Sequence, residues 1–130
     1  MKRLTFIIAR RRAIKATEEV KMPTKKVADI QKITVSINKK GEVVCNPPAP
    51  IVYPGGTVTW ISVRRRHVLA IQFGWDSPFK EVGFVSGADG SITANVERYA
   101  PFGLHKYFVA VYDGETIRTA DPDIIIRPRP

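Results

Sequence analysis

Hydrophobic and polar residues alternate along most of the chain after residue 32. In the segment 67–73, one face of an extended chain would carry His67, Leu69, Ile71 and Phe73, because successive side chains of a strand point to opposite sides. The same period of two, or a short apolar run, recurs along the chain. We therefore expect strands in the segments 32–37, 42–46, 57–63, 67–73, 92–97, 105–112 and 120–127.

Turn signals separate these segments. Asn38 to Gly41 supplies a glycine-containing reversal, and "YPGG" at 53–56 has the outline of a type II turn, with proline and then glycine at its centre. Strands at intervals of about 8–12 residues, without a long helical period, are typical of an all-β sandwich or barrel. We predict an antiparallel Greek-key β-sandwich that spans residues 33–130 as one domain.

Residues 1–32 form a different kind of segment, a basic N-terminal arm. It holds ten Lys or Arg against three Asp or Glu, whereas residues 33–130 hold eleven against nine. Within it the segment 12–22 favours a short helix, which Pro23 would end. Such charge asymmetry indicates either a nucleic acid, an anionic surface or an acidic protein patch as partner, or simply a solvated tail that aids solubility.

The apolar stretch of the arm, "LTFIIA" at 4–9, is shorter than the core of a signal peptide and leads directly into three arginines. No later stretch approaches the roughly 18 apolar residues of a membrane span. The single Cys45 excludes an intrachain disulfide and a multi-cysteine metal site. We therefore expect a cytoplasmic protein without a membrane span.

Residues 42–127 resemble the cupredoxin-like β-sandwich family. The residues that carry the resemblance are "VYPGGTVTW", "HVLAIQF" and "PFGLHKYFVAVY". "DSPF" at 76–79 and "ADPDIII" at 120–126 are similar to the copper-free, small bacterial branch of this fold. The resemblance implies a cupredoxin-like scaffold, and since a fold hosts many functions it does not fix one.

The copper ligands of the family are not retained. A blue-copper site needs two histidines and a thiolate. His67 falls close to the position of the first histidine, but Val109 stands near the thiolate position and Tyr112 near that of the second histidine. A different site built from Cys45, His67 and His105 lacks short ligand spacing, so we expect no metal and no cofactor.

Catalytic patterns are equally sparse. Nothing around Cys45 resembles an activating turn, and alternation favours a buried, inert thiol there. Histidines such as His67 and His105 more often pack at the edge of a core, with one ring nitrogen satisfied by the backbone, and we expect His67 at the edge of the sandwich. We therefore expect a protein that is not an enzyme.

The candidate partner-binding residues are two arginine clusters and two aromatic residues of the loop 74–90. They are Arg10, Arg11, Arg12, Arg64, Arg65, Arg66, Trp75 and Phe79. The loop either covers the end of the sandwich or is a contact surface. We expect a non-catalytic interaction or assembly subunit of a larger complex, docking on an acidic protein surface. The alternative is a nucleic-acid-binding accessory protein, with the arginines on phosphates and the aromatic residues stacked on bases. A metal or redox protein is the remote third hypothesis.

Overall fold

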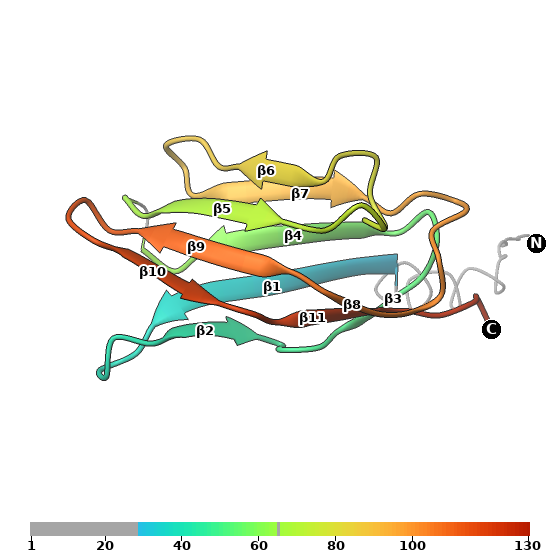
Figure 1. Ribbon diagram of the computed structural model, residues 1–130, viewed down its shortest axis with the longest axis horizontal. Helices are drawn as coiled ribbons and strands as arrows, with labels where there is room; N and C mark the ends of the chain where they lie inside the picture. The colour runs from blue at the N-terminus through green and yellow to red at the C-terminus, as the bar shows by residue number, and fades with distance from the viewer. Residues whose placement is uncertain (1–28, 65) are drawn as a thin grey trace, which may run out of the picture.

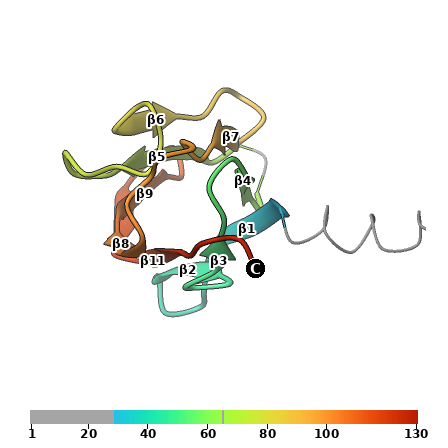
Figure 2. The same ribbon diagram turned by 90° about the vertical axis from the view of Figure 1, so that its right-hand side faces the viewer.

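The computed structural model describes residues 29–64 and 66–130. In these residues the chain forms eleven strands, which assemble into two layers facing each other (Figures 1 and 2). The helix expected at 12–22, the arginines Arg10, Arg11 and Arg12, and Arg65 lie outside the described residues.

The first layer is a four-stranded sheet. Its strands in spatial order are β2 (Val43–Asn46), β1 (Ile30–Ile37), β4 (Thr57–Ser62) and β7 (Ser91–Asn95). The β1 and β4 strands run parallel, with Ile30 opposite Thr57, and the other two pairs are antiparallel. The first strand therefore begins three residues before the boundary expected at residue 33.

The second layer consists of two sheets that lie end to end along the long axis of the sandwich (Figure 1). The larger sheet contains β10 (Ile117–Ala120), β9 (Phe108–Tyr112), β5 (Val68–Gln72) and β6 (Gly83–Val85). The smaller sheet contains β3 (Ile51–Val52), β11 (Asp123–Ile126) and β8 (Gly103–Lys106). Here β3 and β11 are parallel, and every other pair of the layer is antiparallel.

The predicted all-β sandwich is confirmed, with most strand pairs antiparallel as expected and two parallel pairs added. The inward positions that alternation predicted are the core: Leu69, Ile71, Val109 and Val111 are almost fully buried. Trp60 lies at the centre, and its indole N–H donates to the Tyr107 hydroxyl at 2.9 Å. Phe73, Phe79 and Tyr107 surround the indole with ring centroids at 5.7–6.4 Å.

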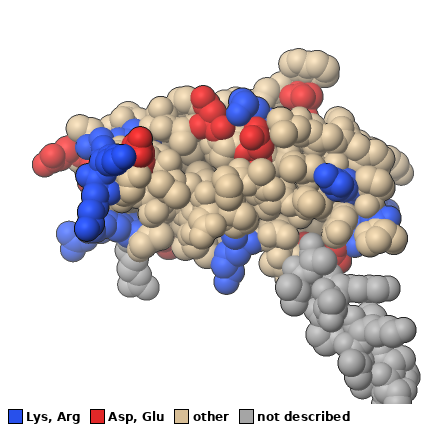
Figure 3. Space-filling model, turned by 90° about the horizontal axis from the view of Figure 1, so that it is seen from below, with Lys and Arg blue, Asp and Glu red and all other residues tan. Residues whose placement is uncertain are grey.

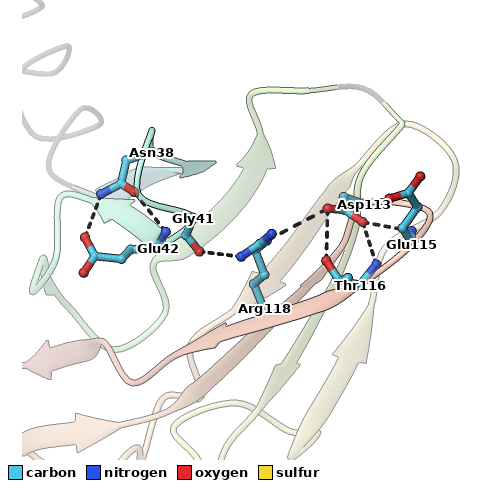
Figure 4. A network of polar contacts seen from close by, with 7 residues as sticks. All are labelled: Asn38, Gly41, Glu42, Asp113, Glu115, Thr116 and Arg118. Atoms are coloured by element: carbon cyan, nitrogen blue, oxygen red, sulfur yellow. Dashed lines mark hydrogen bonds and ion pairs between the residues drawn. The ribbon is translucent and has the colours of Figure 1, made fainter.

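One long side of the sandwich is closed by Arg118 (Figure 4). Its Nη1 donates to the Gly41 carbonyl in the β1–β2 turn at 3.1 Å, and its Nε lies 4.0 Å from Asp113 in the β9–β10 turn. The Asp113 carboxylate in turn accepts from the backbone N–H groups of Glu115 and Thr116, at 2.9 and 2.8 Å. These bonds hold the pKa of Asp113 below its usual range, the Thr116 amide contributing most. The two turns are thereby fixed relative to each other.

Candidate interaction surface

The outward-facing side chains of β10, β9, β5 and β6 form rows that carry no charge. The first row is Ile117, Tyr112 and Val68, and the second is Thr119, Ala110, Ala70 and Val85. The third row pairs Gln72 with Phe108. We call this surface the apolar face.

Large side chains of the apolar face are exposed to solvent. Val85 is 73% exposed, Ile117 67%, and Phe108 and Tyr112 45% each. The strands are four, five, five and three residues long. At about 4.8 Å between strands and about 3.3 Å per residue they give a face of roughly 270 Å². Exposed apolar patches of about 300–600 Å² are the largest on a typical monomer and are often functional.

Beyond the apolar face, the smaller sheet of the same layer repeats the pattern. Lys106 and Asp123 form an ion pair at 3.2 Å. The next row outward consists of Leu104, Ile125 and Ile51, in register across three strands. Leu104 is 61% exposed. Within the cross-strand rows described for this layer, the Lys106–Asp123 ion pair is the only charged pair between the apolar face and the row of Leu104, Ile125 and Ile51.

The predicted arginine cluster borders the apolar face. Arg64 and Arg66 are exposed in the β4–β5 connection, and the His67 amide closes this turn on the Arg64 carbonyl at 3.1 Å. The chain then enters β5 at Val68, the last member of the first apolar row. Basic side chains gather at this end of the molecule, over the β1–β2 and β4–β5 connections, with acidic side chains among them (Figure 3).

The two aromatic residues predicted as partner contacts lie in opposite environments. Trp75 is 95% exposed, whereas Phe79 is 3% exposed and packs edge-on against Trp60 and Phe73. Phe79 forms a β-bridge with Val96, just after β7, and the Pro78 carbonyl accepts from the Glu97 N–H at 2.9 Å. These contacts hold the segment against the sandwich with the Phe79 ring in the core. Phe79 is therefore removed from the candidate surface, and part of the loop 74–90 covers the sandwich end.

Cys45 is buried beside the Tyr107 hydroxyl. Burial raises the pKa of the Cys45 thiol to about 11, with a smaller opposing effect of the hydrogen bond to Tyr107. Burial also raises the pKa of Tyr107, and the Trp60 N–H opposes that rise. At neutral pH the Cys45 thiol is therefore protonated, in the form that is neither a nucleophile nor a metal ligand.

The two histidines lie on β8 and just before β5. His105 is buried on β8, where its Nε2 contacts the Pro101 carbonyl at 2.7 Å and its Nδ1 lies 3.9 Å from Asp76. The packing expected for His105, at a core edge with one nitrogen on the backbone, is observed. His67 is half-buried before β5, Val109 is in the core, and the Tyr112 hydroxyl donates to the Gly114 carbonyl. Among residues 29–64 and 66–130, no three His, Cys, Asp or Glu come together in a way that could hold a metal ion.

The sequence did not indicate the apolar face itself. Phe108 and Tyr112 lie on a face that alternation marks as outward, and apolar residues at such positions are the signal that could have found it. Val85 lies in the segment 74–90, which was expected to be a loop. Ile117 belongs to a strand that was not expected at all.

No family model matches this chain, and no curated protein matches it. Among solved structures, a reduced amicyanin variant aligns with 74% of this chain and 82% of its own, at 16% identity and a TM-score of 0.43. A reduced Cu(I) form of an amicyanin variant at pH 4 aligns over the same shares, at 17% identity and a TM-score of 0.40. Amicyanins are cupredoxins, but values this low carry no conclusion about the chemistry of this chain. By its own strand order the domain is a β-sandwich of two layers, and a cupredoxin-like scaffold is what the resemblance of its sequence motifs implies.

Proposed function

We propose that this protein is a non-catalytic interaction subunit of a larger assembly, which docks through its apolar face and its arginines on a protein with an acidic surface. One observation carries the proposal: the outward-facing row of Ile117, Tyr112 and Val68, of which Ile117 and Tyr112 are exposed, lies directly beside the turn that holds Arg64 and Arg66. Protein interfaces typically combine an apolar centre, often with an aromatic residue, and a charged rim.

The rim accounts for the acidic partner. Exposed guanidinium groups bind carboxylates in a planar, two-pronged geometry, and steer an oppositely charged surface toward the contact. The arm, with Arg10, Arg11 and Arg12, is proposed as a second contact with the same partner. The protonated, buried thiol of Cys45 supports the non-catalytic part of the proposal.

Location in the cytoplasm is part of the proposal, supported by the single unpaired cysteine. In the described residues, no helix combines the length and the apolar character needed to cross a bilayer.

Capture of partners from the native cell tests the proposal. Tagged full-length protein is compared with an Ile117→Lys variant, which places a charge in the first apolar row. A matched Thr34→Lys variant places the same charge on the exposed outer face of the first layer. We expect a stoichiometric partner with an acidic surface, identified by mass spectrometry, with wild type and Thr34→Lys but not with Ile117→Lys. A partner retained equally by all three would refute the role of the apolar face.

Nucleic-acid binding is the second candidate, supported by aromatic side chains at the other end of the domain. Trp75 is 95% and Tyr99 94% exposed, and such rings can stack on unpaired bases. Titration of a labelled single strand at two salt concentrations distinguishes the candidates, because phosphate contacts give a steep salt dependence. Absence of binding at low salt would exclude this function.

A further inference from the structure

On the long side of the sandwich opposite Arg118, the edge strands β6 and β7 belong to different sheets and are not paired with each other. A groove of about 450 Å³ lies there between the edge strands β6 and β7. Phe84, Thr93 and Ala94 line it, and the charged residues Lys80, Glu81 and Glu97 are also among its lining residues. Both edges of the groove are outer strands of their sheets, so each presents backbone groups to it.

The outer edge of β7 presents backbone N–H and C=O groups with which a further strand could pair. Val96 exchanges both of its backbone hydrogen bonds with the β3–β4 turn, donating to Gly56 at 2.8 Å and accepting from Gly55 at 3.0 Å. Since backbone direction alternates along a strand, Thr93 and Asn95 point their N–H and C=O groups the other way, into the groove. Glu97 has the same parity, and its N–H indeed donates outward to the Pro78 carbonyl at 2.9 Å.

Nothing in the side chains of β7 protects this edge. Sheet edges in natural proteins are commonly blocked by lysine, proline or an inward charge. The strand reads Ser-Ile-Thr-Ala-Asn from residue 91 to 95 and has none of these. The short bridge at Phe79 and Val96 covers one end of the edge and leaves Thr93 without a backbone partner among the described strands.

We propose that residues 4–9 of the same molecule, "LTFIIA", occupy this groove as an additional strand beside β7. The segment is rich in residues that favour strands, and its six residues are enough to pair along all five residues of β7. It would satisfy the backbone groups of Thr93 and cover the partly buried ring of Phe84.

The chain is long enough for this pairing. Ile30, Thr57 and Asn95 are in register across β1, β4 and β7, so the new strand lies three strand spacings, about 14 Å, from the start of β1. The twenty residues from 10 to 29 can span up to about 66 Å. A tether of this length gives an effective concentration in the millimolar range, which favours the arm of the same molecule over that of a second copy.

Charge complements the fit. Three arginines follow "LTFIIA" directly, at 10–12, and Lys2 and Arg3 precede it. The groove lining carries Glu81 and Glu97 against Lys80. Basic residues on both sides of the added strand would therefore meet a lining with more carboxylates than ammonium groups.

This inference goes beyond the proposed function. A partner that recruits the arm would compete with the pairing, so the pairing is tested on the full-length chain alone, where its failure leaves the proposed function untouched.

Amide hydrogen exchange at Thr93 tests the pairing. In the wild-type chain we expect this amide to exchange at least about tenfold more slowly than an exposed amide of the same sequence. Ile7→Pro removes a donor and disfavours a strand, and should abolish the protection. Ala16→Pro, in the arm but outside the paired segment, is the matched control and should leave it unchanged. Exchange at Thr93 that is fast in wild type, or unaltered by Ile7→Pro, would overturn the inference.

Two further measurements test which molecule supplies the added strand and whether charge contributes to its binding. Protection that persists on about a hundredfold dilution supports the arm of the same molecule, and protection lost on dilution would assign the strand to a second copy instead and overturn the proposal. Glu97→Lys should speed exchange at Thr93 several-fold. Combining it with Arg10→Glu, Arg11→Glu and Arg12→Glu should restore slow exchange, and failure to restore it would contradict the charge argument.

Discussion

The two outer faces of the sandwich are built on the same strand pattern but carry different chemistry. The outer face of the first layer is rich in hydroxyl and amide side chains, which bond to each other across strands: Thr57 to Asn95 at 3.0 Å and Thr59 to Thr93 at 3.1 Å. The apolar face of the second layer presents Tyr112, Ile117 and Val85 at the equivalent outward positions.

The polar side chains of the first layer are hydrogen-bonded to each other, whereas the apolar face leaves apolar side chains exposed to water. Hydroxyl groups bonded within the sheet lose hydrogen bonds when another surface displaces water, whereas exposed apolar side chains gain about 25 cal/mol per Å² when covered. A sandwich fold requires only that the inner faces be apolar. The apolar outer face is therefore surplus to folding, and this is why we assign binding to it.

The largest difference between the two faces should appear when a lysine is placed on each of them and partner binding is measured. Ile117→Lys should weaken partner binding at least about 30-fold, corresponding to about 2 kcal/mol at a binding hot spot. Thr34→Lys should change the dissociation constant less than about twofold. Both are measured by isothermal titration with the captured partner. Urea unfolding should show both variants folded, and equal loss of binding in the two would remove the distinction between the faces.

The arginine rim should contribute less than the apolar centre, and mainly to the rate of association. The double variant Arg64→Glu, Arg66→Glu should bind about three- to tenfold more slowly at low salt, with the difference vanishing at high salt. Lys32→Glu, an exposed basic residue on the other face, is the matched control. Stopped-flow association at two ionic strengths measures both; a salt-independent effect would argue against an acidic partner.

The buried Cys45 thiol, which lies between the two layers, should make the free energy of unfolding fall at alkaline pH. The pKa of Cys45 is raised from 9.0 to about 11 in the folded protein, so the folded state holds its proton more tightly than the unfolded chain does. The corresponding stability is fully present below about pH 9 and is lost as the pH rises toward 11. Urea unfolding between pH 8 and pH 11 should show this decline, and Cys45→Ala should reduce its slope. An unchanged slope would indicate that Tyr107 alone, whose pKa is raised in the same direction, is responsible.

The hydroxyl pairs of the first layer should have the smallest effect. Thr59→Val removes the contact with Thr93 on a partly exposed surface and should change the free energy of unfolding by less than about 1 kcal/mol, without altering partner binding. Urea denaturation and titration measure the two quantities. A loss of binding here would show that the first layer also takes part in docking.

Much of the fold could be predicted from alternation, because a residue buried on one face of a strand leaves a period of two in the sequence. Leu69, Ile71 and Phe73 were placed in the core on this basis, and they lie there. The short strands β3, β6 and β10 were missed because two to four residues hold too little alternation to stand out from a loop. Phe79 was misplaced since its burial depends on a bridge to Val96, seventeen residues away in the chain.

The sequence by itself determined the fold class, and it shows Val109 and Tyr112 near two positions where copper-binding members of the resembling family have ligands, because both follow from local residue types and their spacing. Only the tertiary structure decided which outward positions are neighbours. The apolar row of Ile117, Tyr112 and Val68 joins residues from three strands, and the groove beside β7 joins residues from two sheets. The physical reason is that cross-strand contacts depend on register and sheet order, which are set by the packing of the whole core and not by any one segment.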